Sequence, residues 1–129
     1  LLFLGLGKLW INGTANKHSD DLTDKIVVIT GANAGLGYIN AEVLAKLNPK
    51  MIVMACRDVT RGLAAVDKIK NEHGLENVMF MQLDLNDLAS VKSFADEFCS
   101  KFDQLDILVN NAGIYAQKER TETVQGFEK

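Results

Sequence analysis

The stretch Thr30-Gly31-Ala32-Asn33-Ala34-Gly35-Leu36-Gly37 decides the fold of this chain. An apolar, β-branched run, Lys25-Ile26-Val27-Val28-Ile29, precedes it and predicts a buried parallel strand. Apolar residues at 36, 39, 43, 44 and 47 follow and predict an amphipathic helix. Glycines let the backbone approach a pyrophosphate, and the helix N-terminus offers free N–H groups. A glycine-rich turn in this position therefore predicts a phosphate site.

The glycine spacing is G-x-x-x-G-x-G, at Gly31, Gly35 and Gly37, whereas the common dinucleotide fingerprint is G-x-G-x-x-G. A P-loop needs Gly-Lys-Ser/Thr at its end, and the stretch has none, which argues against an ATPase or GTPase. The alternative is that these glycines serve only to turn the chain.

Length and composition indicate one soluble globular domain, with 129 residues, 47% hydrophobic and 24% charged. The net charge of −3 and the lack of a basic run give no reason to expect nucleic acid. Cys56 and Cys99 each sit in an apolar element, so we expect buried, reduced thiols. We therefore expect the protein in the cytoplasm or on the cytoplasmic face of a membrane. His18 and His73 are isolated, so no metal site is expected.

Residues 1–11 are strongly apolar but too short for a bilayer span, which needs about 20 residues. They predict either a membrane contact or an amphipathic arm that packs on the body of the protein. Residues 1–24 are interpreted as this arm and a polar linker, and residues 25–129 as a nucleotide-binding domain.

Strands and helices alternate along the rest of the chain. Strands are expected at 51–56, 77–83 and 105–110, and helices from Asp58 to about 72 and from about 86 to 102. The expected buried positions on these helices are Val59, Leu63, Val66 and Ile69, then Leu88, Val91, Phe94, Ala95, Phe98 and Phe102. Right-handed crossovers then give a doubly wound α/β fold of Rossmann type, with a parallel sheet in the order 3-2-1-4. A full fold of this kind adds strands beside the fourth, so we expect the domain to continue beyond Lys129.

Three motifs in order resemble the short-chain dehydrogenase/reductase family. They are Thr30-Gly31-x-x-x-Gly35-x-Gly37, Asp84 after the third strand, and Asn110-Asn111-Ala112-Gly113 after the fourth. Asp21-Leu22-Thr23-Asp24-Lys25 and Ala55-Cys56-Arg57-Asp58 resemble the branch that contains retinol dehydrogenases. Ala34 and Tyr38 depart from that branch, where Ser or Thr and Lys are common.

The resemblance implies a set of coenzyme-binding residues. Gly31, Asn33, Gly35, Leu36 and Gly37 would hold the pyrophosphate and its ribose, Asp84 and Leu85 would lie by the adenine, and Asn111, Ala112 and Gly113 would border the cofactor ribose and support the sheet. The alternative is that Asp84 only begins a helix and that Asn110 and Asn111 only satisfy backbone groups.

Arg57 decides the expected cofactor. It stands at the end of the second strand, where an acidic residue would favour NAD and an arginine accommodates the 2′-phosphate of NADP. Paired hydrogen bonds from a guanidinium suit a phosphate, so we predict NADP. NAD is the alternative, because Asp58 could turn toward the phosphate and repel it.

The resemblance implies an oxidoreductase that interconverts a carbonyl and an alcohol on a small lipophilic molecule, with hydride exchanged with the nicotinamide. The family's catalytic Ser, Tyr and Lys would lie beyond this chain. Tyr115 is not expected to be the catalytic tyrosine, because Glu119 occupies the position four residues later. The alternatives are a regulatory module that binds NAD(P) without turnover and an S-adenosylmethionine methyltransferase. We expect the complete protein to be a homo-oligomer.

Overall fold

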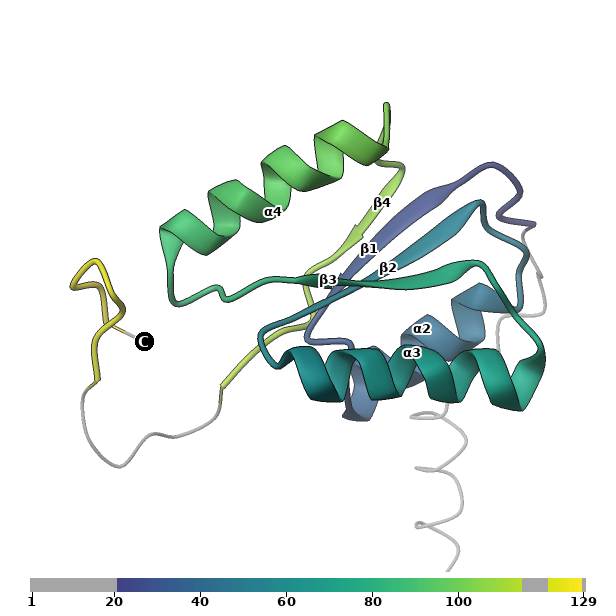
Figure 1. Ribbon diagram of the computed structural model, residues 1–129, viewed down its shortest axis with the longest axis horizontal. Coiled ribbons are helices and arrows are strands. Elements are labelled where there is room, and N and C mark those ends of the chain that lie inside the picture. Colours follow the sequence, from purple (N-terminus) through teal and green to yellow (C-terminus); the bar gives the residue numbers. More distant parts are fainter. Residues whose placement is uncertain (1–20, 115–120, 129) are drawn as a thin grey trace, which may run out of the picture.

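The computed structural model describes residues 21–114 and 121–128. Along the chain it has β1 (Ile26–Thr30), α2 (Gly35–Ala45), β2 (Met51–Cys56), α3 (Val59–His73), β3 (Val78–Gln82), α4 (Leu88–Lys101) and β4 (Ile107–Val109). The strands are parallel in the order β3-β2-β1-β4, which confirms the predicted topology. Figure 1 shows α2 and α3 on one face of the sheet and α4 on the other.

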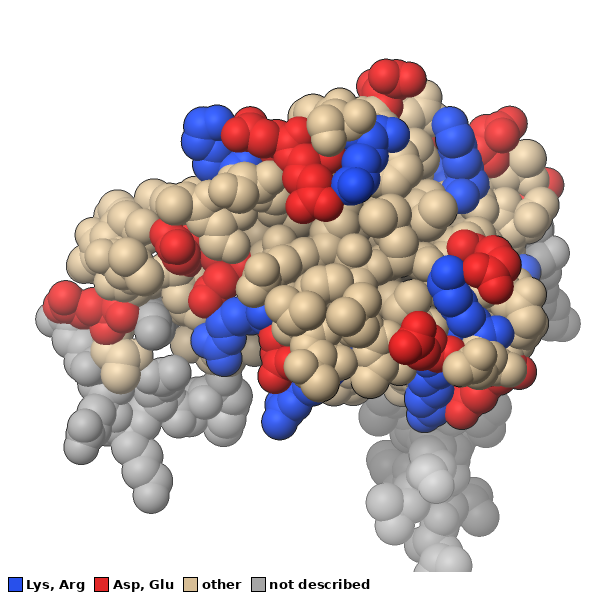
Figure 2. All heavy atoms as spheres, viewed as in Figure 1, with Lys and Arg blue, Asp and Glu red and all other residues tan. Residues whose placement is uncertain are grey.

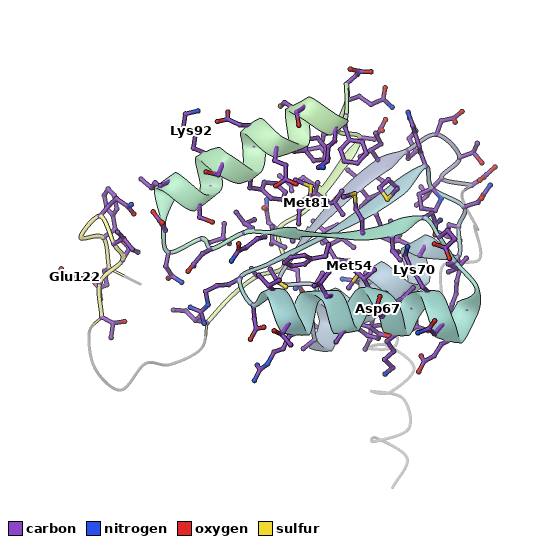
Figure 3. All side chains as sticks on the ribbon, in the orientation of Figure 1. Met54, Asp67, Lys70, Met81, Lys92 and Glu122 are labelled. Carbon is purple, nitrogen blue, oxygen red and sulfur yellow. The ribbon has the colours of Figure 1, made fainter. Side chains whose placement is uncertain are left out.

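The sheet separates two hydrophobic clusters. Met54 belongs to the cluster under α2 and α3, and Met81 belongs to the cluster under α4 (Figure 3). All five residues of β1 are buried, because helices cover both faces of this central strand. A strand that is buried on both faces needs apolar side chains at every position, which explains the continuous β-branched run in β1.

The predicted buried face of α2 is wrong in its particulars. Leu36, Ile39 and Val43 are 73%, 51% and 52% exposed. The buried positions of the helix are Gly37, Ala41 and Ala45. Small residues bring the helix backbone close to the sheet, and Leu36, Ile39 and Val43 then point away from it, whereas Leu44 packs partly buried against the core. The close approach of α2 to the sheet at the glycine-rich turn therefore decides which face of the helix is buried, and not the spacing of its large apolar residues.

The helices α3 and α4 begin close to the predicted positions, and each has an aspartate N-cap. Asp58 accepts a hydrogen bond from the Arg61 N–H over 2.9 Å, and Asp87 accepts one from the Ala89 N–H over 2.9 Å. Such N-caps satisfy N–H groups that have no partner within the helix. Gly74 ends α3 in the left-handed conformation.

Several predicted core positions on these two helices are exposed: Val59, Leu63, Leu88 and Ala95. They lie in the first turns of the helices or beside the inward-facing stripe, where the sheet does not reach. The prediction of two buried thiols is half correct, since Cys56 is buried but Cys99 is exposed on α4.

β4 pairs with β1 alone among the described strands, and Leu108 on it is half exposed. Just before β4, Asp106 accepts hydrogen bonds from the Ile26 N–H over 2.8 Å and from Lys25 Nζ over 3.0 Å. Backbone and side-chain bonds therefore fix the register of this short strand at its amino end.

Acidic and basic side chains are interspersed on the surface that Figure 2 shows. Many of them form helical pairs four residues apart, such as Lys92 with Asp96 at 2.6 Å. Within residues 21–114 and 121–128 no helix is long and apolar enough to cross a membrane. The apolar segment 1–11 and Tyr115 lie outside the described residues.

Candidate functional site

A cleft of about 400 Å³ lies at the carboxyl ends of the strands. Its lining comes from the ends of β1, β2 and β3, from the residues after β4, and from the C-terminal turn (residues 121–128): Thr30, Gly31, Asn33, Ala55, Cys56, Arg57, Leu83, Asp84, Leu85, Asn86, Ala112, Gly113, Ile114, Thr123 and Glu128. In a parallel sheet, the crevice outside the carboxyl ends is where ligands bind, at the point where the strand order reverses. That point here lies between β1 and β4.

The cleft brings together seven of the eleven predicted coenzyme-binding residues. They are Gly31, Asn33, Arg57, Asp84, Leu85, Ala112 and Gly113. The other four do not line it: Gly35 borders a neighbouring hollow, Leu36 is exposed, and Gly37 and Asn111 pack behind the turn. The resemblance had implied a supporting role only for Asn111, Ala112 and Gly113, and had placed Gly35, Leu36 and Gly37 at the pyrophosphate and its ribose.

Gly31 and Gly37 are required by close packing. A Cβ on Gly37 would lie 2.5 Å from Asn111 Nδ2 and 2.5 Å from the Gly31 carbonyl oxygen. A Cβ on Gly31 would lie 2.9 Å from Ala112 Cα, and its φ of +65° is one that other residues rarely adopt. The turn after β1 is therefore pressed against the segment that follows β4.

Thr30 and Asn111 join the same two segments by hydrogen bonds. Thr30 Oγ1 accepts from the Asn111 N–H over 3.1 Å and from the Ala112 N–H over 3.0 Å. Asn111 Nδ2 donates to the Thr30 carbonyl over 2.9 Å and to the Gly31 carbonyl over 3.3 Å. Asn111 therefore supports the sheet, as the resemblance implied in part, and its amide is occupied by backbone groups.

The N-terminus of α2 differs from those of α3 and α4. Its N-cap is Ala34, which makes no side-chain hydrogen bond, whereas α3 and α4 each begin with an aspartate cap. The first N–H groups of a helix lack partners within it, and the helix dipole makes this end positive. An anion at this end would accept hydrogen bonds from the helix N–H groups, as the Asp58 and Asp87 carboxylates do at the other two helices.

Arg57 lines the cleft directly after β2, and its carbonyl accepts a hydrogen bond from Gln82 Nε2 over 3.3 Å. The Asp58 carboxylate caps α3 through the Arg61 N–H, as described above. Burial raises the pKa of the neighbouring Cys56 thiol, which therefore stays protonated and adds no charge to the cleft.

Asp84 forms a tight turn at the end of β3. Its Oδ1 accepts from the backbone N–H and from the side-chain Nδ2 of Asn86, both over 2.9 Å. The Asp84 N–H in turn donates to Ser90 Oγ over 2.9 Å. These bonds fix the backbone at Leu85, whose side chain is half exposed at the cleft. Leu85 thus gives the cleft an apolar surface beside a carboxylate.

A second hollow, of about 390 Å³, lies between the glycine-rich turn and α3. Asn33 borders both hollows, while Arg61 and Lys68 line only this one. Lys68 Nζ lies 5.1 Å from the centre of the Tyr38 ring. Burial raises the pKa of Tyr38, against a smaller opposite effect of Lys68, and keeps its hydroxyl neutral.

Sequence reasoning missed residues of two kinds. Arg61 and Lys68 lie on α3, which follows Arg57. Their helical spacing was a usable signal that these cations gather near the glycine-rich turn. Thr123 and Glu128 carried no such signal, because a turn distant in sequence brings them to the cleft.

Comparison with known proteins agrees with this geometry. Residues 25–128 match the family model for short chain dehydrogenases. Salutaridine reductase of Papaver bracteatum is 47% identical over 93 residues, which cover 70% of this chain and 29% of that protein. Human retinol dehydrogenase 12 is 40% identical over 107 residues, which cover 83% of this chain and 33% of that protein. The chain therefore spans about a third of the length of such relatives.

Among solved structures, L-sorbose reductase from Gluconobacter frateurii in complex with NADPH and L-sorbose superimposes with a TM-score of 0.66 at 32% identity. The match covers 82% of this chain and 39% of that one. Other solved relatives were crystallised with NAD or with NADP. The sheet order, the cleft at the carboxyl ends and the family match over residues 25–128 lead to one conclusion. The chain belongs to the short chain dehydrogenase family.

Proposed function

We propose that this chain is the coenzyme-binding part of an NADP-dependent oxidoreductase that interconverts a carbonyl and an alcohol on a small lipophilic molecule. The relatives named above are two reductases and one dehydrogenase, and the name of the dehydrogenase specifies retinol, a lipophilic alcohol. When bound, the nicotinamide supplies or accepts hydride. The part of the reaction that these residues perform is to hold the coenzyme.

One observation carries the preference for NADP. Asp58, the acidic residue nearest the end of β2, caps α3 through the Arg61 N–H, while Arg57 lines the cleft. An arginine at this point suits a 2′-phosphate, whereas an acidic residue facing the cleft would suit the ribose hydroxyls of NAD. Arg61 lies one helical turn further on and lines the neighbouring hollow with Asn33, and its Nε pairs with Asp58 Oδ2 over 3.6 Å.

The residues present also fit the rest of a dinucleotide. The N-terminus of α2 has no side-chain cap, so its N–H groups can receive the pyrophosphate. The two glycines at Gly31 and Gly37 leave no Cβ between this helix and the end of β4. Leu85 offers an apolar surface to the adenine, with the Asp84 carboxylate beside it.

The proposal is tested by titrating the chain with NADPH and with NADH, with the fluorescence of the nicotinamide as the measure of binding. Tighter binding of NADPH is expected. Arg57→Ala should weaken NADPH binding by about 10- to 100-fold, as for a lost hydrogen bond to a charged group, and NADH binding by far less. Lys92→Ala, which removes an exposed cation on α4, is the matched control. Tighter binding of NADH would assign the site to NAD, and binding of neither would overturn the proposal.

The alternative function is a regulatory module that binds the same coenzyme without turnover. It predicts the same titrations but no hydride transfer by the complete protein.

The proposal also includes three properties of the complete protein: membrane association through residues 1–11, a location on the cytoplasmic face of a membrane, and homo-oligomerisation. Flotation of the chain with phospholipid vesicles, with and without residues 1–11, tests the membrane contact.

A further inference from the structure

The C-terminal turn lies against the N-terminal end of α4, as Figure 1 shows in yellow. Glu122 and Glu128 form an antiparallel bridge. Within that bridge the Thr123 N–H donates to the Phe127 carbonyl over 2.7 Å, and the Phe127 N–H donates to Thr123 Oγ1 over 3.0 Å. The C-terminal turn is therefore internally closed and can move or dock as a unit.

Gln125 attaches this unit to α4 by both ends of its amide. Its Oε1 accepts from the Leu88 N–H over 3.2 Å, and its Nε2 donates to Asp87 Oδ1 over 2.9 Å. Asp87 is the N-cap of α4, so Gln125 extends an existing cap. The Val124 N–H adds a third bond, to the Asn86 carbonyl over 3.2 Å.

These attachments lie next to the cleft. Asn86 and Asp87 directly follow Leu85, and Asn86 lines the cleft together with Thr123 and Glu128 of the C-terminal turn. This end of the cleft is formed by β2 and β3, where Arg57 would take the 2′-phosphate that sits on the adenosine. The C-terminal turn thus forms a wall at the adenosine end.

We propose that Gln125 is a positioning residue for adenosine binding: it holds the C-terminal turn on α4 so that Thr123 closes the adenosine end of the cleft. This inference rests on the proposed coenzyme-binding function. Without Gln125 the turn is docked in only a fraction of the molecules, and the apparent Kd rises by the inverse of that fraction.

The experiment titrates the chain and its variants with adenosine 2′,5′-bisphosphate, which carries the adenosine end alone, and with NADPH. Gln125→Ala should weaken both by roughly fivefold, as for a lost pair of exposed hydrogen bonds. Gln125→Glu keeps an acceptor for the Leu88 N–H but sets a carboxylate against Asp87, and should weaken both ligands too. Gln104→Ala is the matched control, because Gln104 bridges Asp24 and Asp106 at the other end of the sheet.

Hydrogen exchange supplies a readout that a purely structural role would not move. In the wild type, adenosine 2′,5′-bisphosphate should slow amide exchange at Thr123, Val124 and Phe127. In Gln125→Ala these amides should exchange faster without ligand, and saturating ligand should slow them by a larger factor than in the wild type, because binding then also docks the turn. Wild-type affinity in either Gln125 variant, or no ligand-linked slowing in the wild type, would overturn this inference alone. Failure of the wild type to bind NADPH or NADH would overturn the proposed function, and the inference with it.

Discussion

Asn111 donates two hydrogen bonds to Thr30, one from its backbone N–H to Oγ1 over 3.1 Å and one from its side chain to the carbonyl over 2.9 Å. Thr30 is 5% exposed and is the buried polar residue of the described core. The two residues join the ends of β1 and β4, which is also where the strand order of the sheet reverses. The floor of the cleft therefore depends on one hydroxyl and one amide.

Thr30→Val removes that hydroxyl at nearly constant volume. The Ala112 N–H then loses the hydroxyl as its acceptor, and the Asn111 N–H keeps the Val109 carbonyl at 3.0 Å, so the change should cost about 1–3 kcal/mol of unfolding free energy. Denaturant unfolding measures the change. Thr30→Ser should recover most of it, and Thr60→Val on the exposed start of α3 should have little effect. Equal stability of Thr30→Val and Thr30→Ser would contradict the role of the hydroxyl.

Gly37→Ala tests the close approach of α2 to the end of β4. The added methyl would meet Asn111 Nδ2 and the Gly31 carbonyl at 2.5 Å, so backbone must shift. We expect a loss of roughly 1–3 kcal/mol, typical of an overpacked core, and weaker NADPH binding. Gly113→Ala is the matched control for stability alone, since nothing lies within 4 Å of its Cβ position but the residue lines the cleft. A thermal melt of Gly37→Ala that matches the wild type would refute this packing.

Gly62 and Phe80 form a second close contact, between α3 and β3. A Cβ on Gly62 would lie 2.3 Å from the Phe80 ring. Gly62→Ala should therefore destabilise the fold despite the better helix propensity of alanine. Phe80→Leu frees space at the ring edge, so the double variant should lose less than the sum of the two single changes. A double-mutant cycle in urea measures this coupling, and strict additivity would argue against the contact.

Asp106 makes the stability of the sheet depend on pH. The Ile26 N–H, and then Lys25, hold the pKa of this carboxyl below its ordinary value. A lowered folded pKa means that the stabilisation is present above the unfolded pKa of about 3.9 and is lost as the pH falls through the folded pKa. Asp106→Asn should lower the urea midpoint at pH 7, with the difference from the wild type shrinking toward pH 3. A difference that stays constant over this range would exclude the charge as its cause.

The topology could be predicted from the sequence because each strand is short and apolar and a helix separates it from the next strand. Asp58 and Asp87 were identifiable as caps, and the strand order follows from right-handed crossovers. The buried face of α2 could not be predicted from periodicity. Gly37, Ala41 and Ala45 pack because the helix must approach the sheet at the glycine-rich turn, and that demand outweighs burial of Leu36 and Ile39.

The candidate site divides in the same way. Arg57 and Gly31 directly follow strand ends and Asp84 lies two residues after one, and the carboxyl ends of parallel strands meet, so their positions in the cleft were predictable. The contribution of Thr123 to the cleft could not be predicted, because Gln125 docks the C-terminal turn onto residues more than thirty positions earlier in the sequence. Local pattern carries no information about such a contact.

The two cysteines give the chain a built-in handle for spectroscopy. Cys56 is buried and its thiol is held protonated, whereas Cys99 is exposed on α4, away from the residues that line the cleft. Alkylation requires an accessible thiolate. A maleimide fluorophore should therefore attach at Cys99 alone while the chain is folded, and the appearance of a second labelled cysteine would report the opening of the sheet at β2.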